Sequence, residues 1–386
     1  MTDDAPVNDP RTRLPSLTGM RILAALSVFF CHATFQAFYG DRGPAPSLEG
    51  PATAAGWLGV AFFFVLSGFV LTWSSRPGDA ARDFWRRRFV KIYPNHLVTW
   101  TAVLLLAFLP GQAAADRATW GKTLPSLLLV HAWVPDAEVM NALHVPSWSL
   151  SCELLFYLCF PLVIRAVRAI RPDRLWACAA GLVALVVLVP ALAQWLLPDT
   201  PKMPWFPMSV WDYWAVYSLP PVRLLEFTLG VVMARIVISG RWVGLGLGPA
   251  FCLLAAGVVL QVKLVPSPWA MVAPTVVPLA LVIAAAADRD SRGRPSLLAA
   301  PVMTWLGEIS FALYLVHLPV LTYGRLVLGG GWSAPAASGV EAGLLGVALA
   351  LAAALHTWVE RPAMRRWSRR RPGRAAPAPR PVTEPG

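Results

Sequence analysis

An arginine and a histidine stand eleven positions apart in the first apolar run, RILAALSVFFCH, at Arg21 and His32. At 100° per residue, eleven steps return to within about 20° of the starting side of a helix, roughly 16 Å further along the axis. Ionisable groups in hydrocarbon cost several kcal/mol and are functional candidates by default. A neutral imidazole is a general base near neutral pH. The alternative is that Arg21 snorkels to lipid headgroups and His32 only packs.

Three other apolar runs bring polar groups to a similar depth. In the third of them, WLGEISFALYLVH, Ser310, Tyr314 and His317 stand at positions i, i+4 and i+7, which predicts that they share one helix face. The set comprises Glu153, Arg223, Glu226, Ser310, Tyr314 and His317. Glu226 could simply neutralise Arg223 three residues earlier. Tyr314 and His317 could be aromatic-belt residues at the membrane interface. Together, the groups predict a polar site in the outer half of the membrane.

A basic segment, DFWRRRFVKIYPNHL, precedes a run that we expect to begin as a helix at Pro94. Arg87, Arg88 and Lys91 are donors of the kind that hold phosphates. Topology and binding of anionic lipids are the alternative explanation. If both sites exist, the protein accepts a phosphorylated cytosolic molecule and performs chemistry deeper in the membrane.

The elements that must position these residues are transmembrane helices. Only 14% of the 386 residues are charged and 56% are hydrophobic, whereas soluble domains carry roughly 25% charged residues. Basic loops alternate with loops poor in Lys and Arg, which predicts an even number of spans with both termini cytoplasmic. We therefore expect an all-α polytopic membrane protein with about ten transmembrane helices, near 16–38, 54–73, 94–110, 148–164, 175–197, 219–238, 242–262, 268–287, 301–325 and 338–359.

The rest of the composition excludes several classes. The net charge of +12 comes from short loops between apolar runs, so it does not indicate a nucleic-acid partner. No His, Cys or acidic cluster has metal-ligand spacing, and the five cysteines lie in apolar runs. Residues 1–15 lack signal-peptide features and predict a disordered cytoplasmic tail, as does the basic, Pro-rich 363–386. Residues 16–362 form the transmembrane domain, with a re-entrant or interfacial helix expected within 111–147.

Seven motifs in order resemble the acyltransferase 3 family of polytopic membrane enzymes, which O-acylate bacterial surface glycans and some macrolides. They are Arg21-x10-His32, GVAFFFVLSGFVL at 59–71, RRRFVKIYP at 86–94, WSLSCELLFY at 148–157, RLLEFTLG at 223–230, LGEISFALYLVH at 306–317 and ERP at 360–362. Arg21 and His32 match the family's essential pair. In its basic motif R-x-x-R-I-x-P, Arg88 matches the first arginine and Lys91 replaces the second. Many relatives carry an additional periplasmic esterase-like domain, which is not seen here.

The resemblance implies transfer of an acyl group, by default acetyl, from cytosolic acyl-coenzyme A (acyl-CoA) to a hydroxyl. We expect Arg21, Arg87, Arg88 and Lys91 to bind acyl-CoA, and the pantetheine arm to follow residues 25–28. His32 then acts as general base, oriented by Glu153 as in a catalytic triad; a covalent acyl-histidine is the open alternative. Ser67 could allow close approach of substrate or serve helix packing, and Tyr314 could stabilise the oxyanion.

The acceptor implied is a carbohydrate, a glycolipid or a macrolide, and the location implied is the bacterial plasma membrane. We expect acyl-CoA as co-substrate, no tightly bound cofactor and no metal. A transporter or flippase is the main alternative, because buried charges also suit substrate pathways. A non-catalytic membrane scaffold is the second alternative, and it would not depend on His32.

Overall fold

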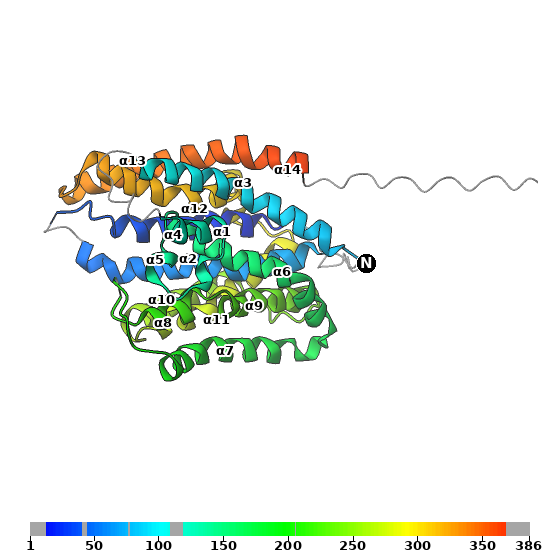
Figure 1. Cartoon of the computed structure of the whole chain (residues 1–386). Coiled ribbons are helices and arrows are strands. Elements are labelled where there is room, and N and C mark those ends of the chain that lie inside the picture. The colour runs from blue at the N-terminus through cyan, green and yellow to red at the C-terminus, as the bar shows by residue number, and fades with distance from the viewer. Residues whose placement is uncertain (1–12, 41–44, 76–77, 109–118, 205, 368–386) are drawn as a thin grey trace, which may run out of the picture.

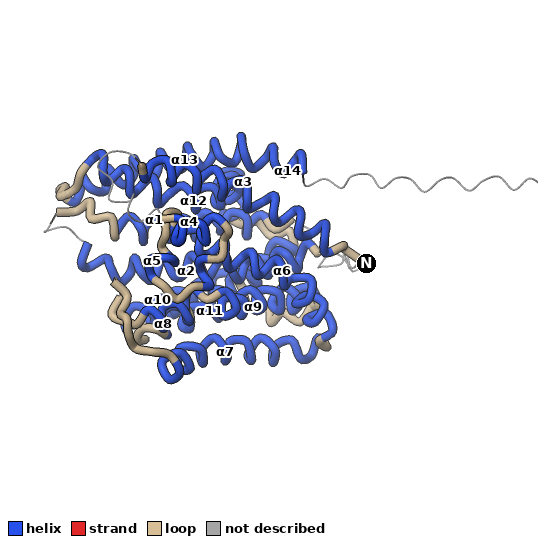
Figure 2. The backbone as a smooth tube through the Cα atoms, viewed as in Figure 1, coloured by secondary structure: helices blue, strands red, loops and turns tan. Residues whose placement is uncertain are grey.

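The computed structural model describes residues 13–40, 45–75, 78–108, 119–204 and 206–367, and within these ranges it is all-helical (Figure 2). Only two isolated bridges, Tyr39 with Trp332 and Lys202 with Ser209, represent β-structure there. In this part of the chain, ten helices have 17 or more residues: α1 Pro15–Thr34, α2 Ala45–Ser74, α3 Ala81–Ala107, α6 Trp148–Ala169, α7 Leu175–Leu196, α9 Pro220–Ile238, α10 Leu247–Lys263, α11 Ala273–Ser291, α12 Pro301–Leu328 and α13 Ala334–Leu355.

Short helices connect or extend these ten. They are α4 Trp120–Leu127, η1 His131–Trp133, α5 Ala137–Met140, η2 Val145–Ser147, η3 Pro172–Arg174, α8 Val210–Tyr213, η4 Trp214–Ser218, η5 Trp269–Met271, η6 Leu297–Ala299, η7 His356–Glu360 and α14 Arg361–Trp367. The expected interfacial helix in 111–147 is represented by α4, η1 and α5, while 109–118 lie outside the described residues. The predicted terminal tails mostly lie outside them too, and residues 363–367 are helical.

Seven helices among the described residues are long and apolar enough to cross a membrane, some of them together with a short neighbouring helix. They are α1, α2, α6, α7, α11, α12 and α13. Of the other long helices, α10 has 17 residues, α9 carries three charged side chains, and α3 begins with a basic segment that extends to Lys91 and is followed by Asn95 and His96. The all-helical membrane fold is thus confirmed, whereas ten crossings and cytoplasmic termini stay predictions.

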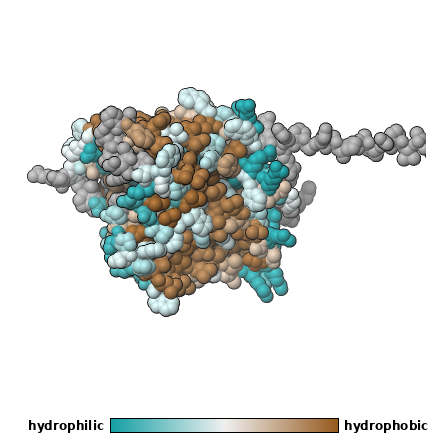
Figure 3. Space-filling view, viewed as in Figure 1, coloured by the Kyte–Doolittle hydropathy of each residue, from teal (hydrophilic) through white to brown (hydrophobic). Residues whose placement is uncertain are grey.

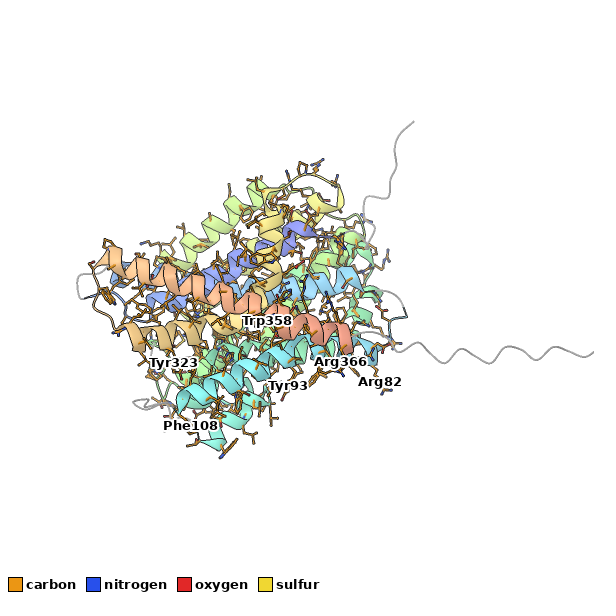
Figure 4. All side chains as sticks on the ribbon, turned by 90° about the horizontal axis from the view of Figure 1, so that it is seen from above. Arg82, Tyr93, Phe108, Tyr323, Trp358 and Arg366 are labelled. Carbon is orange, nitrogen blue, oxygen red and sulfur yellow. The ribbon has the colours of Figure 1, made fainter. Side chains whose placement is uncertain are left out.

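On the face shown in Figure 3, an apolar band lies between two more polar ends. Figure 1 shows the long helices running between these ends, with the start of α1 and the end of α14 at the same end. In Figure 4, Arg82 at the start of α3 and Arg366 in α14 lie at that end, and Phe108 and Tyr323 lie toward the other. We call it the basic end, because α14 and the start of α3 carry many of the chain's arginines.

The start of α3 corrects one prediction. The helix begins at Ala81, thirteen positions before Pro94, so the basic segment is helical and Pro94 lies in the helix interior. The residues before Pro94 are mostly Arg, Phe, Val, Lys and Ile, and none of residues 81–93 breaks a helix. Proline is tolerated inside transmembrane helices because neighbours can satisfy the freed backbone groups. Arg87, Arg88 and Lys91 are therefore placed on a rigid helix.

Helix α1 lies at the centre of the bundle, packed against α2 and α12, and α2 packs in turn against α9. The crossing of α2 and α9 is held by Gly68 and Gly230. A Cβ atom added to Gly68 would lie 1.9 Å from the Phe227 carbonyl oxygen, and one added to Gly230 would lie 1.9 Å from that of Val65. Only glycine permits backbones this close, so Gly68 in the motif LSGF serves helix packing.

Two prolines free backbone carbonyls that then bind other helices. A proline in a helix removes the N–H that would bond the carbonyl four residues earlier. Pro319 thus frees the carbonyl of Leu315, which accepts a hydrogen bond from His144 Nε2 at 2.9 Å. Similarly, Pro161 frees the carbonyl of Tyr157, which accepts from the Trp85 indole N–H at 3.0 Å.

Candidate functional site

A cavity of about 50 Å³ lies between α1, α2, α6 and α12. Since one water molecule needs at least roughly 10–15 Å³ of such volume, the cavity has room for a few small groups at most. Its polar lining comes from three helices, and its apolar lining mostly from α2. The lining residues are Arg21, Val60, Phe63, Phe64, Ser149, Leu150, Glu153, Phe311 and Tyr314. Arg21, Glu153 and Tyr314, all predicted from the sequence, therefore meet at one site.

Glu153 lies at the centre of a hydrogen-bonded and electrostatic network. Its Oε2 accepts from the Tyr157 hydroxyl at 3.0 Å, and the Ser67 hydroxyl also reaches Tyr157. Arg21, Arg88 and Lys91 are all close enough to act on its charge. The cluster therefore balances the carboxylate with several cations, as a charge buried in a low-dielectric site requires. No hydrogen bond between described residues joins Glu153 to His32.

The partner of His32 is instead His317 of α12. His32 Nδ1 lies 2.8 Å from His317 Nε2, and the two ring centroids are 5.0 Å apart. The His317 ring also contacts the ring of Tyr314, at 5.7 Å between centroids. Since Tyr314 lines the cavity, a continuous series of side chains connects the Arg21 cavity with His32.

The basic residues of α3 divide into two groups. The Arg88 guanidinium lies over the rings of Phe84 and Tyr157, 5.6 and 5.9 Å from their centroids. Arg87 is half-buried and close enough to Arg88 to act on its charge. Lys91 differs, because its ammonium group is paired with the buried carboxylate of Glu360 in η7. That Lys91 binds acyl-CoA stays a prediction.

Glu360 accepts from several groups at once. Asn95 Nδ2 donates to its Oε2 at 2.8 Å, and His356 Nδ1 lies 3.2 Å from Oε1. Together with Lys91, these contacts attach the C-terminal helical segment to the middle of α3. We call these four residues, Lys91, Asn95, His356 and Glu360, the α3–η7 cluster.

Three predicted candidates lie outside this cavity and outside the contacts of Glu153, His32 and α3 described above. Arg223 and Glu226 form a buried ion pair at 2.9 Å, each side chain only 1% exposed. The Arg223 guanidinium also lies 5.0 Å from the Phe64 ring centroid and 5.2 Å from that of Tyr217. Ser310 donates to the Gly307 carbonyl of its own helix at 2.8 Å. The geometry of the ion pair agrees with the simpler interpretation that Glu226 neutralises Arg223.

Sequence reasoning missed several residues of the network. Ser149 and Tyr157 flank Glu153 at intervals of four, a helical spacing that could have revealed them. Ser149 donates to the Tyr314 hydroxyl oxygen at 2.9 Å. His144 offered no local signal, because its partner Leu315 lies 171 positions away along the chain. Glu360 was part of the motif ERP, but its pairing with Lys91, 269 positions away, gave no local signal either.

A bundle of long apolar helices with ionisable groups around an internal cavity defines a polytopic membrane protein with an intramembrane polar site. The family described as "Acyltransferase domain" matches residues 14–358. The chain belongs to this family, the acyltransferase 3 family, and it is a membrane O-acyltransferase. The family resemblance stated from the sequence is thereby confirmed.

Curated relatives agree with this assignment. The chain is 43% identical to "Acyltransferase MdmB" of Streptomyces mycarofaciens over 95% of this chain and 96% of that protein. It is 24% identical to "Putative peptidoglycan O-acetyltransferase YrhL" of Bacillus subtilis, over 80% of this chain but about half (48%) of that relative's length. "Exopolysaccharide production protein ExoZ" of Rhizobium meliloti is 27% identical over 82% of this chain and 92% of that protein. No solved structure matches the chain.

Proposed function

We propose that this enzyme transfers an acyl group from acyl-CoA, bound at the basic end, to a hydroxyl of a carbohydrate, glycolipid or macrolide acceptor, with His32 as the general base. The observation that carries the proposal is the continuity from Arg21 in the cavity to His32 through Tyr314 and His317. A cation suited to an anionic donor and a nitrogen base thus belong to one connected site.

The donor phosphates would bind Arg21, Arg87 and Arg88, since Lys91 is engaged by Glu360. The expected pantetheine track along α1 is filled by packing, because Ala25 is only 3% exposed and Val28 only 1%. The cavity lies beside that track, and Phe63 and Phe311 flank it. A volume of about 50 Å³ is too small for a pantetheine arm, so we infer that donor binding moves these side chains apart.

The reaction joins the thioester of the donor to the acceptor hydroxyl beside His32. The unprotonated nitrogen of His32 removes the proton of the acceptor hydroxyl, whose oxygen attacks the thioester carbon. The tetrahedral intermediate then collapses, the C–S bond breaks, and the coenzyme A thiolate takes the proton back from His32. Tyr314 is suited to stabilise the oxyanion, because its side chain lines the cavity and a phenolic hydroxyl can donate a hydrogen bond. A covalent acyl-histidine would use the same nitrogen as nucleophile.

The relatives' names favour a glycan acceptor, since two of them refer to peptidoglycan and to exopolysaccharide. The proposal also includes the bacterial plasma membrane as location, ten membrane crossings, both termini on the cytosolic side and no tightly bound cofactor. Acetyl is the proposed acyl group. The transporter alternative predicts flux of a substrate without consumption of an acyl donor.

The test compares wild-type chain with His32→Ala and, as a matched control one residue away on α1, Cys31→Ala. Cells expressing each variant are fed labelled acetate, and lipid and small-molecule extracts are searched by mass spectrometry for products that gain one acetyl unit. We expect His32→Ala to abolish the product at equal membrane abundance, and Cys31→Ala to retain it. Full product with His32→Ala would remove the proposed base.

A further inference from the structure

The two histidines that meet between α1 and α12 have unequal environments. His317 is 1% exposed, whereas His32 is half-buried. Both nitrogens of His317 have neighbours, Nε2 with His32 and Nδ1 with the Leu313 carbonyl oxygen at 3.3 Å. His32 contacts His317 through Nδ1, and the backbone of Val28, one turn earlier in α1, also lies within reach of its ring. Among the described residues, no hydrogen bond involves the other ring nitrogen of His32, Nε2.

We propose that His317 is the positioning residue of the base: it holds His32 in the tautomer whose Nε2 is unprotonated and turned toward substrate. The inference rests on the proposed role of His32. It assigns to His317 the orienting function that the sequence suggested for Glu153, which instead accepts from Tyr157.

The direction of each hydrogen bond follows from one fixed acceptor. A backbone carbonyl oxygen only accepts, so the nitrogen facing Leu313, His317 Nδ1, carries the proton. In a neutral imidazole the other nitrogen then has a lone pair, so His317 Nε2 accepts. The proton between the rings therefore belongs to His32 Nδ1, and His32 Nε2 is left as the basic nitrogen.

The same hydrogen bonds stabilise the positive charge that His32 gains when it takes a proton during turnover. When His32 Nε2 takes the acceptor's proton, the ring becomes an imidazolium, and its Nδ1–H bond to His317 strengthens. The acceptor series from His317 Nε2 to the Leu313 carbonyl stabilises this cation by aligned dipoles, as a carboxylate does in a triad. A second histidine does so without placing a permanent negative charge beside the apolar core.

Two substitutions separate this role from packing. His317→Gln keeps an acceptor oxygen for His32 Nδ1–H, and His317→Leu removes it at similar volume. The matched control is His144→Leu, another buried histidine, which binds the Leu315 carbonyl of the same helix but not His32. We expect His317→Leu to lower kcat by about 100-fold or more, as loss of the orienting residue does in a catalytic triad, with KM within about threefold. His317→Gln should stay within about tenfold of wild type, and His144→Leu should retain kcat.

A spectroscopic readout needs no turnover. The full chain, labelled with ¹⁵N-histidine and placed in lipid nanodiscs, should show His32 with a protonated Nδ1 and an unprotonated Nε2, assigned by the signals lost in His32→Gln. In His317→Leu both tautomers should appear. An unprotonated Nδ1 in wild type, or wild-type kcat in His317→Leu, would overturn the inference. Activity in His32→Ala would instead overturn the proposed function itself, so the two failures are distinguishable.

Discussion

The α3–η7 cluster gives a prediction that decides what Lys91 does. The sequence motif suggests a donor-binding cation, whereas the structure pairs Lys91 with Glu360, of which only 3% is exposed. We change the pair by Lys91→Met, by Glu360→Gln and by both substitutions together. If Lys91 serves the structure, either single change should destabilise the protein, and the double change should recover most of the loss.

The magnitude follows from burial. Removing one partner of a buried ion pair costs about 3–5 kcal/mol, because the other charge remains uncompensated. Lys91 keeps 27% of its side chain exposed, so we expect the low end, about 3 kcal/mol for Lys91→Met. An unfolding entropy of about 2.1 cal/mol/K per residue over 386 residues converts this into a Tm lowered by about 4 °C. The double variant should lie within about 1 °C of wild type.

The assay is thermal unfolding of detergent-purified protein, followed by size-exclusion chromatography, together with KM for acetyl-coenzyme A. Lys122→Met is the matched control, because Lys122 pairs with Glu138, whose side chain is 72% exposed, and such pairs contribute about 0–1 kcal/mol. Strictly additive effects in the double variant would refute the coupling. A raised KM for Lys91→Met at unchanged Tm would make Lys91 a donor-binding residue after all.

Two further predictions concern the donor site and the helix crossing. Arg88→Ala should raise KM for acetyl-coenzyme A about tenfold, about 1.4 kcal/mol, at similar kcat, whereas the exposed Arg82→Ala should not; equal KM values in steady-state assays would move the phosphates elsewhere. Gly230→Ala should lower the free energy of unfolding by about 3 kcal/mol or more, because its Cβ would lie 1.9 Å from a backbone oxygen. Gly181→Ala, with open space around it, should be neutral or slightly stabilising, and equal Tm values for both variants would contradict the close crossing.

Much of the fold could be predicted, because apolar length is a local property of the sequence. All ten predicted spans coincide with long helices. Glu153 and Tyr314, expected in one polar site, line one cavity, and Arg21, expected nearer the cytoplasmic side, lines it too. The predicted helix start at Pro94 is wrong, because this proline lies inside α3, which begins at Ala81.

The pairings could not be predicted, because they depend on which helices become neighbours. His32 and His317 are 285 positions apart, and Lys91 and Glu360 are 269 positions apart. Helical periodicity places a side chain on a face, but it does not name the helix opposite. Glu153 was a reasonable partner for His32 in type and depth, and only the packing of α1 against α12 brings His317 there instead.

Because Pro319 has no backbone N–H, the Leu315 carbonyl oxygen is free to bind another segment of the chain. His144, at the end of the segment that runs through α4, η1 and α5, binds the Leu315 carbonyl only two residues before His317. A carbonyl that an uninterrupted helix would use internally thus fastens this segment to α12 instead. The proline that interrupts the helix is therefore what allows α12 to hold a distant part of the chain in place.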